Sequence, residues 1–126
     1  MKLEHIALSV TDTEEIKNFY FNILEMEEVK SFVLNKELAN NIFKIEKEVL
    51  VFLLQKDKLF FEIFVTNMQN NQSYNHVCIA IQKREELVEK AIKQGYICIR
   101  IKRDMFDLIF IKDKNGNIFE IKESNI

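Results

Sequence analysis

The chain has 126 residues, of which 48% are hydrophobic and 30% are charged, and its formal net charge is −2. This composition is typical of one soluble globular domain and excludes a disordered chain. Acidic and basic residues are mixed, so no basic stripe indicates a nucleic-acid partner. No signal-peptide pattern and no apolar run long enough to cross a bilayer is found, so we expect a cytoplasmic protein without membrane contact. The two cysteines, Cys78 and Cys98, do not suggest a disulfide scaffold.

The first half of the chain is predicted to contain a strand, a helix and three further strands. The strand covers 5–10, and the helix at 11–25 begins with a possible Thr11–Glu14 capping box. Apolar residues recur along this helix at the spacing of one face: Ile16, Phe19, Tyr20, Ile23 and Leu24. The extended segments that follow are 29–34, 49–54 and 59–65. The segment 35–47, with Leu38, Ile42, Phe43 and Ile45, fits a short amphipathic helix that is either an ordered surface excursion or a substrate lid.

The second half repeats this order of elements. "HVCIAI" at 76–81 resembles "HIALSV" at 5–10, and the triplet "FEI" at 61–63 recurs at 119–121. A helix is predicted at 83–95, where Gly95 is a suitable C-terminal stop. Its apolar face consists of Leu87, Val88, Ala91 and Ile92. The extended segments that follow are 96–102, 106–112 and 117–122.

Side-chain alternation places one histidine and one glutamate of each half on a face with small or aromatic neighbours. His5 shares a face with Ala7 and Ser9, and His76 shares one with Cys78 and Ala80. Glu62 lies between Phe60 and Phe64 on its own face, and Glu120 lies between Ile118 and Lys122. The four polar side chains can therefore point into a common concave surface.

Glu62 stands in the apolar stretch "LFFEIFV", although a glutamate is rarely buried unless it is paired or bound to a cation. Taken singly, a histidine at a strand start is more often a hydrogen-bonded surface residue, and a glutamate on an edge strand often faces water. The chain has only two histidines, and both begin an apolar strand at matching points of the repeat. A divalent metal bound by His5, Glu62, His76 and Glu120 accounts for all four residues, and Ni²⁺, Co²⁺, Zn²⁺, Mn²⁺ and Fe²⁺ suit these ligands.

Three segments, "HIALSVTDTEEIKNFYFNILEM", "NHVCIAI" and "DKNGNIFEIKE", resemble the vicinal oxygen chelate superfamily. That superfamily includes glyoxalase I, methylmalonyl-CoA epimerase, extradiol dioxygenases and the fosfomycin and bleomycin resistance proteins. The resemblance implies an α+β fold of two βαβββ modules, at about 1–67 and 74–126, that form a cupped, barrel-like mixed sheet with helices outside. It also places His5, Glu62, His76 and Glu120 on the ligand positions of the glyoxalase and epimerase branches. Members are commonly paired, so we expect a homodimer, which light scattering would distinguish from a monomer.

The sequence departs from the family at three places. Glu25 stands where glycine often follows the helix, and a left-handed residue there costs glutamate more than glycine. Ser9 stands at the position where, by the resemblance, bacterial glyoxalase I has an arginine that binds the glutathione carboxylate. The usual glycine-rich stretch before the penultimate strand is reduced to "KRDMFD". These differences concern glutathione recognition and leave the metal ligands intact.

The ligand set favours a metal-dependent lyase or isomerase that acts on a small molecule by proton transfer through an enediolate. Glu120 is the expected proton carrier, and Glu62 mainly coordinates. Further residues that we assign to the substrate pocket are Ser9, Phe60, Phe64, Cys78 and Arg100. Cys78 is alternatively a buried structural thiol, and Arg100, like Lys102, is alternatively solvated on an edge strand. Two other functions stay open: an Fe(II) dioxygenase with three protein ligands, and a bleomycin-resistance-like protein that binds its ligand without metal.

Overall fold

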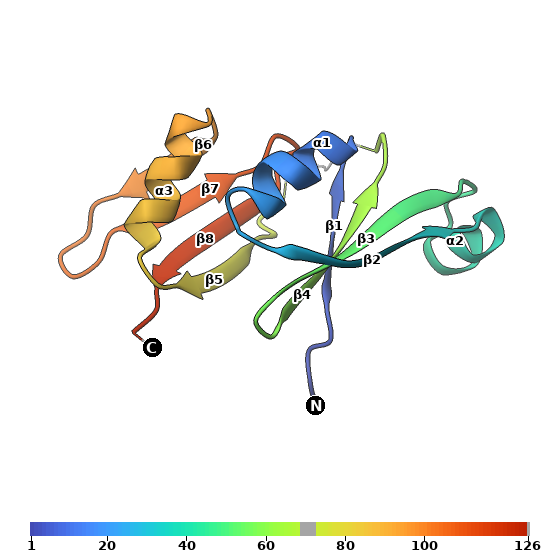
Figure 1. Ribbon diagram of the computed structural model, residues 1–126, viewed down its shortest axis with the longest axis horizontal. Coiled ribbons are helices and arrows are strands. Elements are labelled where there is room, and N and C mark those ends of the chain that lie inside the picture. Colours follow the sequence, from blue (N-terminus) through green and yellow to red (C-terminus); the bar gives the residue numbers. More distant parts are fainter. Residues whose placement is uncertain (69–72, 126) are drawn as a thin grey trace. The chain divides into compact units, whose positions relative to one another are not determined.

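The computed structural model describes residues 1–68 and 73–125, and the chain divides into two compact units, Met1–Gln69 and Asn70–Ile126 (Figure 1). Each unit contains one mixed sheet of four strands. The expected α+β class and the repeated strand, helix and three strands are thus confirmed in both units. None of the helices in the described part of the chain has the length and apolar character that crossing a membrane requires.

In the first unit, β1 and β4 lie side by side and run parallel, and the sheet order is β1-β4-β3-β2. Its elements in chain order are β1 (Ile6–Val10), α1 (Thr13–Glu15), the π-helix η1 (Ile16–Phe21), β2 (Glu27–Leu34), α2 (Lys36–Phe43), β3 (Val49–Lys56) and β4 (Leu59–Val65). The five apolar residues predicted to form the inner face of the first helix are all at most 2% exposed, which confirms that face. The ring of Tyr20 on this face meets the ring of Phe61 of β4 edge-on, with 6.3 Å between centroids, so the helix contributes its apolar face to the core of the unit.

The first helix is capped one residue later than the sequence indicated. Asp12 is the N-cap residue, and its side chain accepts a hydrogen bond from the backbone N–H of Glu15 at 3.2 Å. The predicted Thr11–Glu14 capping box was therefore wrong. Asp12 has an extended backbone with φ of −151°, from which a short carboxylate reaches the N–H three residues on, and aspartate caps as well as threonine.

Glu25 follows the turn after η1 and has the left-handed conformation, with φ of 57°, as its position in the sequence suggested. Glycine adopts this conformation without the steric cost of a Cβ atom. We therefore expect Glu25→Gly to raise the free energy of unfolding by about 0.5–1 kcal/mol in denaturant titrations followed by circular dichroism. Glu25→Gln is the matched control, because it keeps the Cβ and removes the charge that pairs with Lys56, whose Nζ lies 3.8 Å from Oε2. A Glu25→Gly protein no more stable than Glu25→Gln would contradict the strain argument.

The insertion forms the expected short helix, α2, which Asn35 caps by accepting from the backbone N–H of Leu38 at 2.8 Å. Its apolar side chains are less buried than in an ordinary amphipathic helix, because Leu38 is 46% and Ile42 60% exposed. The ring of Phe43 meets the ring of Phe64 edge-on, with 5.7 Å between centroids. The end of α2 thus lies against the face of β4 that carries Glu62, and its role as a substrate lid stays a prediction.

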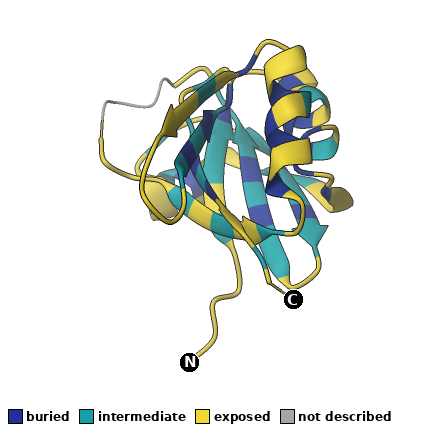
Figure 2. Ribbon diagram, turned by 90° about the vertical axis from the view of Figure 1, so that its left-hand side faces the viewer, coloured by how far each residue is buried: buried dark blue, intermediate teal, exposed yellow. Residues whose placement is uncertain are grey.

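The second unit repeats the topology of the first, with sheet order β5-β8-β7-β6 and β5 parallel to β8. Its elements are β5 (Val77–Ile81), α3 (Arg84–Lys93), β6 (Ile97–Ile101), β7 (Leu108–Lys112) and β8 (Ile118–Glu123). Buried and less buried residues alternate along β7 and the first part of β8, as Figure 2 shows for the strands in general. This period of two separates a face that packs under α3 from a face that is left open.

The helix α3 begins and ends close to the predicted positions. Leu87, Val88 and Ala91 are buried as expected, but Ile92 is 57% exposed, so its assignment to the inner face was wrong. The helical pattern alone does not fix how wide the buried stripe is, because the neighbouring sheet decides where it ends. Gly95 has φ of 85° and follows the helix, which confirms its role as the stop.

Candidate metal centre

The first histidine and glutamate meet within the first unit. His5 directly precedes β1, and Glu62 stands at the centre of β4, opposite Ala7 in the parallel register of the two strands. Because His5 and Ala7 are two residues apart, they share the face on which the Glu62 side chain lies. The Nε2 atom of His5 is 3.2 Å from Oε1 of Glu62. The Glu62 side chain is 22% exposed, so this carboxylate is recessed but reachable.

The second pair has the same construction in the second unit. His76 directly precedes β5, and Glu120 on β8 lies opposite Cys78. The Nε2 atom of His76 is 3.5 Å from Oε1 of Glu120, whose side chain is 16% exposed. The Nδ1 atom of His76 lies 2.9 Å from the backbone oxygen of Tyr74. Since a carbonyl oxygen only accepts, Nδ1 carries the hydrogen of this bond, and in the neutral ring the lone pair belongs to Nε2.

The chemistry of these pairs fits a metal ion. A neutral imidazole lone pair facing a carboxylate is repelled by it, and the contact becomes favourable when a proton or a cation lies between the two groups. A histidine that donates Nδ1–H to a backbone carbonyl and offers Nε2 is the usual arrangement of a metal-binding histidine. Among the described residues of either unit, no third histidine, cysteine, aspartate or glutamate joins these pairs closely enough to hold a metal.

Three residues that the sequence assigned to the substrate pocket surround Glu62. Phe60 and Phe64 lie two residues on either side of Glu62 on β4, so their side chains share its face. Ser9 lies opposite Phe64 in the register of β1 and β4. The structure thus brings these residues together with the first pair, and their contact with substrate stays a prediction.

Cys78 lies on the same face as Glu120 in the second unit. It is exposed, so the alternative that it is a buried structural thiol was wrong. Partial desolvation of its sulfur and, less strongly, the Glu120 carboxylate raise the pKa of the thiol above its ordinary value. The thiol is therefore protonated at neutral pH and offers a neutral, polarisable wall beside Glu120.

Arg100 lies on the opposite face of the second sheet from Glu120. Ile99 of β6 is opposite Phe110, which in turn is opposite Glu120, so the neighbouring Arg100 points the other way. Its guanidinium donates to Asp107 Oδ2 at 2.9 Å and to Glu85 Oε2, and these bonds lower the pKa of both carboxyls. This arrangement favours a structural role and does not support the predicted substrate contact.

A pocket of about 710 Å³ in the second unit reaches Glu120. Its lining includes Lys122 on β8, Arg103 and Phe106 in the segment before β7, and Arg84 at the start of α3. The sequence reasoning missed these residues, because an arginine or lysine at a helix start, in a loop or on a strand is usually solvated. Only the packing of the three segments brings these residues to the same pocket.

The comparison with known families agrees with the motifs. Residues 2–121 match the model of the Glyoxalase/Bleomycin resistance protein/Dioxygenase superfamily. The chain belongs to this superfamily. A search of curated proteins finds no match. The resemblance seen in the first-strand, second-strand and closing-strand motifs is therefore confirmed for nearly the whole chain.

Solved structures of superfamily members share the fold of this chain. A glyoxalase family protein from Bacillus cereus has a TM-score of 0.78 at 14% identity, covering 98% of this chain and 93% of its own. A glutamate-to-glutamine mutant of the fosfomycin resistance protein FosX from Listeria monocytogenes, in complex with Mn(II) and 1S,2S-dihydroxypropylphosphonic acid, has a TM-score of 0.77 at 21% identity, covering 99% of this chain and 94% of its own. A glyoxalase family protein from Enterococcus faecalis has a TM-score of 0.72 at 21% identity, covering 95% of both chains.

Proposed function

We propose that this superfamily member is a metal-dependent lyase or isomerase whose divalent metal is bound by His5, Glu62, His76 and Glu120. The observation that carries the proposal is the repeated histidine–carboxylate pair, with Nε2 to Oε1 distances of 3.2 Å and 3.5 Å in the two units. Two imidazoles and two carboxylates suit a transition metal that retains open coordination positions. Membership of the superfamily supports this donor set, and Mn(II) in the Listeria FosX structure agrees with a divalent ion.

The reaction we propose is the movement of a proton at a carbon next to a carbonyl group. When bound, the metal supplies Lewis-acid stabilisation of negative charge on the substrate oxygen. We assign to Glu120 the acceptance and return of the proton, and the support for this is that its carboxylate is recessed and lines the pocket of the second unit. Glu62 mainly coordinates, and Phe60 and Phe64 on its face exclude water from the apolar part of the substrate.

The two rival functions make different demands on these residues. An Fe(II) dioxygenase uses two histidines and one carboxylate, so the second recessed carboxylate at Glu62 argues against it. A protein that binds its ligand without metal does not require the two matched histidine–glutamate pairs.

Fosfomycin is included among the substrates to be tested, because Listeria FosX was solved with a phosphonate and because Arg103 and Lys122 line the pocket here.

Metal analysis of the purified protein tests the proposal directly. Protein prepared without chelator should contain about one divalent transition metal per chain, because two neutral imidazoles and two carboxylates bind such ions tightly. The double variant His5→Ala/His76→Ala, purified in parallel, controls for metal bound elsewhere on the surface, because alanine offers no atom that replaces an imidazole nitrogen. A wild-type protein with no more metal than the double variant, yet with ligand affinity intact, would support the metal-free binding protein instead.

A further inference from the structure

The strand that carries Glu120 loses its partner on one side just after this residue. In the described part of the second unit, the register of β7 and β8 runs from Lys112 opposite Ile118 to Phe110 opposite Glu120. Both strands continue beyond that point, β7 toward Leu108 and β8 to Glu123. The register with β5 on the other side continues as far as Glu123. The backbone after Glu120 therefore needs another partner if it is to be held as firmly as the backbone before it.

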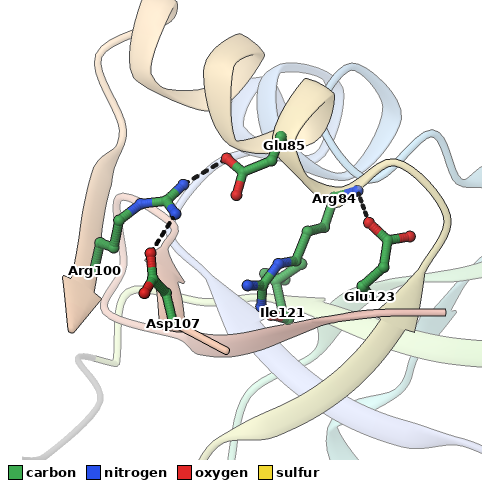
Figure 3. Close-up of polar contacts among 6 residues, drawn as sticks. All are labelled: Arg84, Glu85, Arg100, Asp107, Ile121 and Glu123. Carbon is green, nitrogen blue, oxygen red and sulfur yellow. Dashed lines mark hydrogen bonds and ion pairs between the residues drawn. The ribbon is translucent and has the colours of Figure 1, made fainter. Parts of the chain in front are cut away.

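Arg84 is that partner. Its side chain passes from the start of α3 toward β8, where Nη1 donates to the backbone oxygen of Ile121 at 3.1 Å (Figure 3). The residue is only 9% exposed, and a guanidinium is costly to bury unless it donates hydrogen bonds. The contact is therefore built into the interior rather than a chance surface pairing.

The carboxylate of Glu123 forms a second connection between the end of β8 and the start of α3. It accepts from the backbone N–H of Lys83 at 2.9 Å and from that of Arg84 at 3.1 Å, as Figure 3 shows for Arg84. Lys83, the N-cap residue of α3, has a left-handed backbone and no side-chain cap, so Glu123 satisfies the first N–H groups of the helix in its place. Helix and strand are thus connected at Ile121 and at Glu123, on the side of β8 opposite the Glu120 side chain.

We infer that Arg84 is a positioning residue that holds the backbone next to Glu120 and thereby fixes where this carboxylate lies relative to His76. The inference rests on the proposed role of Glu120 as a metal ligand. Arg84 acts from behind the strand: its hydrogen bond is to the residue that follows Glu120, not to the carboxylate. An arginine suits the task because its planar group offers several N–H donors in fixed directions, whereas a lysine offers a flexible point charge.

Two measurements on Arg84→Met and Arg84→Lys test the inference. In metal-free protein, amide hydrogen exchange of residues 121–124 should become about 10-fold faster in Arg84→Met, since a buried acceptor loses its donor. In competition with a chromophoric chelator, Mn(II) affinity should fall about 10–100-fold, the range for loss of a group that orients a ligand. Arg84→Lys should show smaller changes than Arg84→Met in both the amide exchange of 121–124 and the Mn(II) affinity. If Arg84→Met does not fold, Arg84→Lys alone is compared with the wild-type protein.

The control is Glu85→Ala, which removes the contact with Arg100 at the same end of α3 without touching β8. It should leave both the exchange of 121–124 and the Mn(II) affinity unchanged. Unaltered exchange of 121–124 in both Arg84 variants would overturn the inference. Mn(II) affinity that is unaltered in both Arg84 variants, although Glu120→Gln lowers it, would overturn the inference as well. If Glu120→Gln itself leaves Mn(II) affinity unchanged, the proposed metal ligand is wrong and the positioning role is overturned with it.

Discussion

Replacement of Glu120 by glutamine is expected to lower turnover by ~10²–10⁴ while the fold stays intact, the range for loss of a general acid–base group. An amide oxygen still coordinates a metal, but an amide does not accept the proton. Metal affinity should therefore fall modestly and turnover severely. Glu62→Gln is the matched variant, because it makes the same chemical change at the corresponding position of the first unit. It should weaken metal binding to a similar degree and cost less turnover.

The assay for this comparison begins with the substrates that the chemistry indicates. These are 2-oxoaldehyde–thiol adducts and 2-substituted malonyl thioesters, which carry a proton next to a carbonyl group, and each is followed with metal-loaded protein. Equal losses of turnover in Glu62→Gln and Glu120→Gln would refute the division of roles between the two carboxylates. An increase in KM alone, with kcat unchanged, would show that Glu120 binds substrate without moving a proton.

Replacement of either histidine by alanine is expected to abolish most of the metal occupancy, because alanine offers no atom that replaces an imidazole nitrogen. Elemental analysis of His5→Ala and His76→Ala, purified without chelator, measures this directly. The two variants should behave alike, since the pairs have the same construction in the two units. Turnover should fall with occupancy and should return in part when excess Mn(II) is added, if affinity rather than folding is affected.

Tyr74→Ala provides the control for His76→Ala. The contact from Nδ1 of His76 goes to the backbone oxygen of Tyr74, which any residue at that position retains. The Tyr74 side chain is fully exposed, so its loss should leave metal occupancy unchanged. Should the histidine and glutamate variants all keep wild-type ligand affinity, the concave faces would form a metal-independent binding site and the enzymatic proposal would fail.

Most of the secondary structure could be predicted from the sequence, because the signals are local. A continuous apolar run predicted β4 with the bounds Leu59–Val65, and helical spacing predicted the buried face of the first helix. The cap at Asp12 and the exposure of Ile92 could not be predicted. Each depends on a choice between adjacent residues that have similar propensities, and packing against the sheet makes that choice.

The sequence by itself determined which neighbours along its own strand share a face with each histidine and each glutamate, since side-chain parity follows from the period of a strand. Only the tertiary structure decided that β1 and β5 pair in parallel with β4 and β8, which sets His5 beside Glu62 and His76 beside Glu120. It also placed Arg100 among Glu85 and Asp107, away from Glu120, and Arg84 beneath the end of β8. Strand register and the burial of a charged side chain depend on contacts between segments far apart in the chain, and no local pattern encodes them.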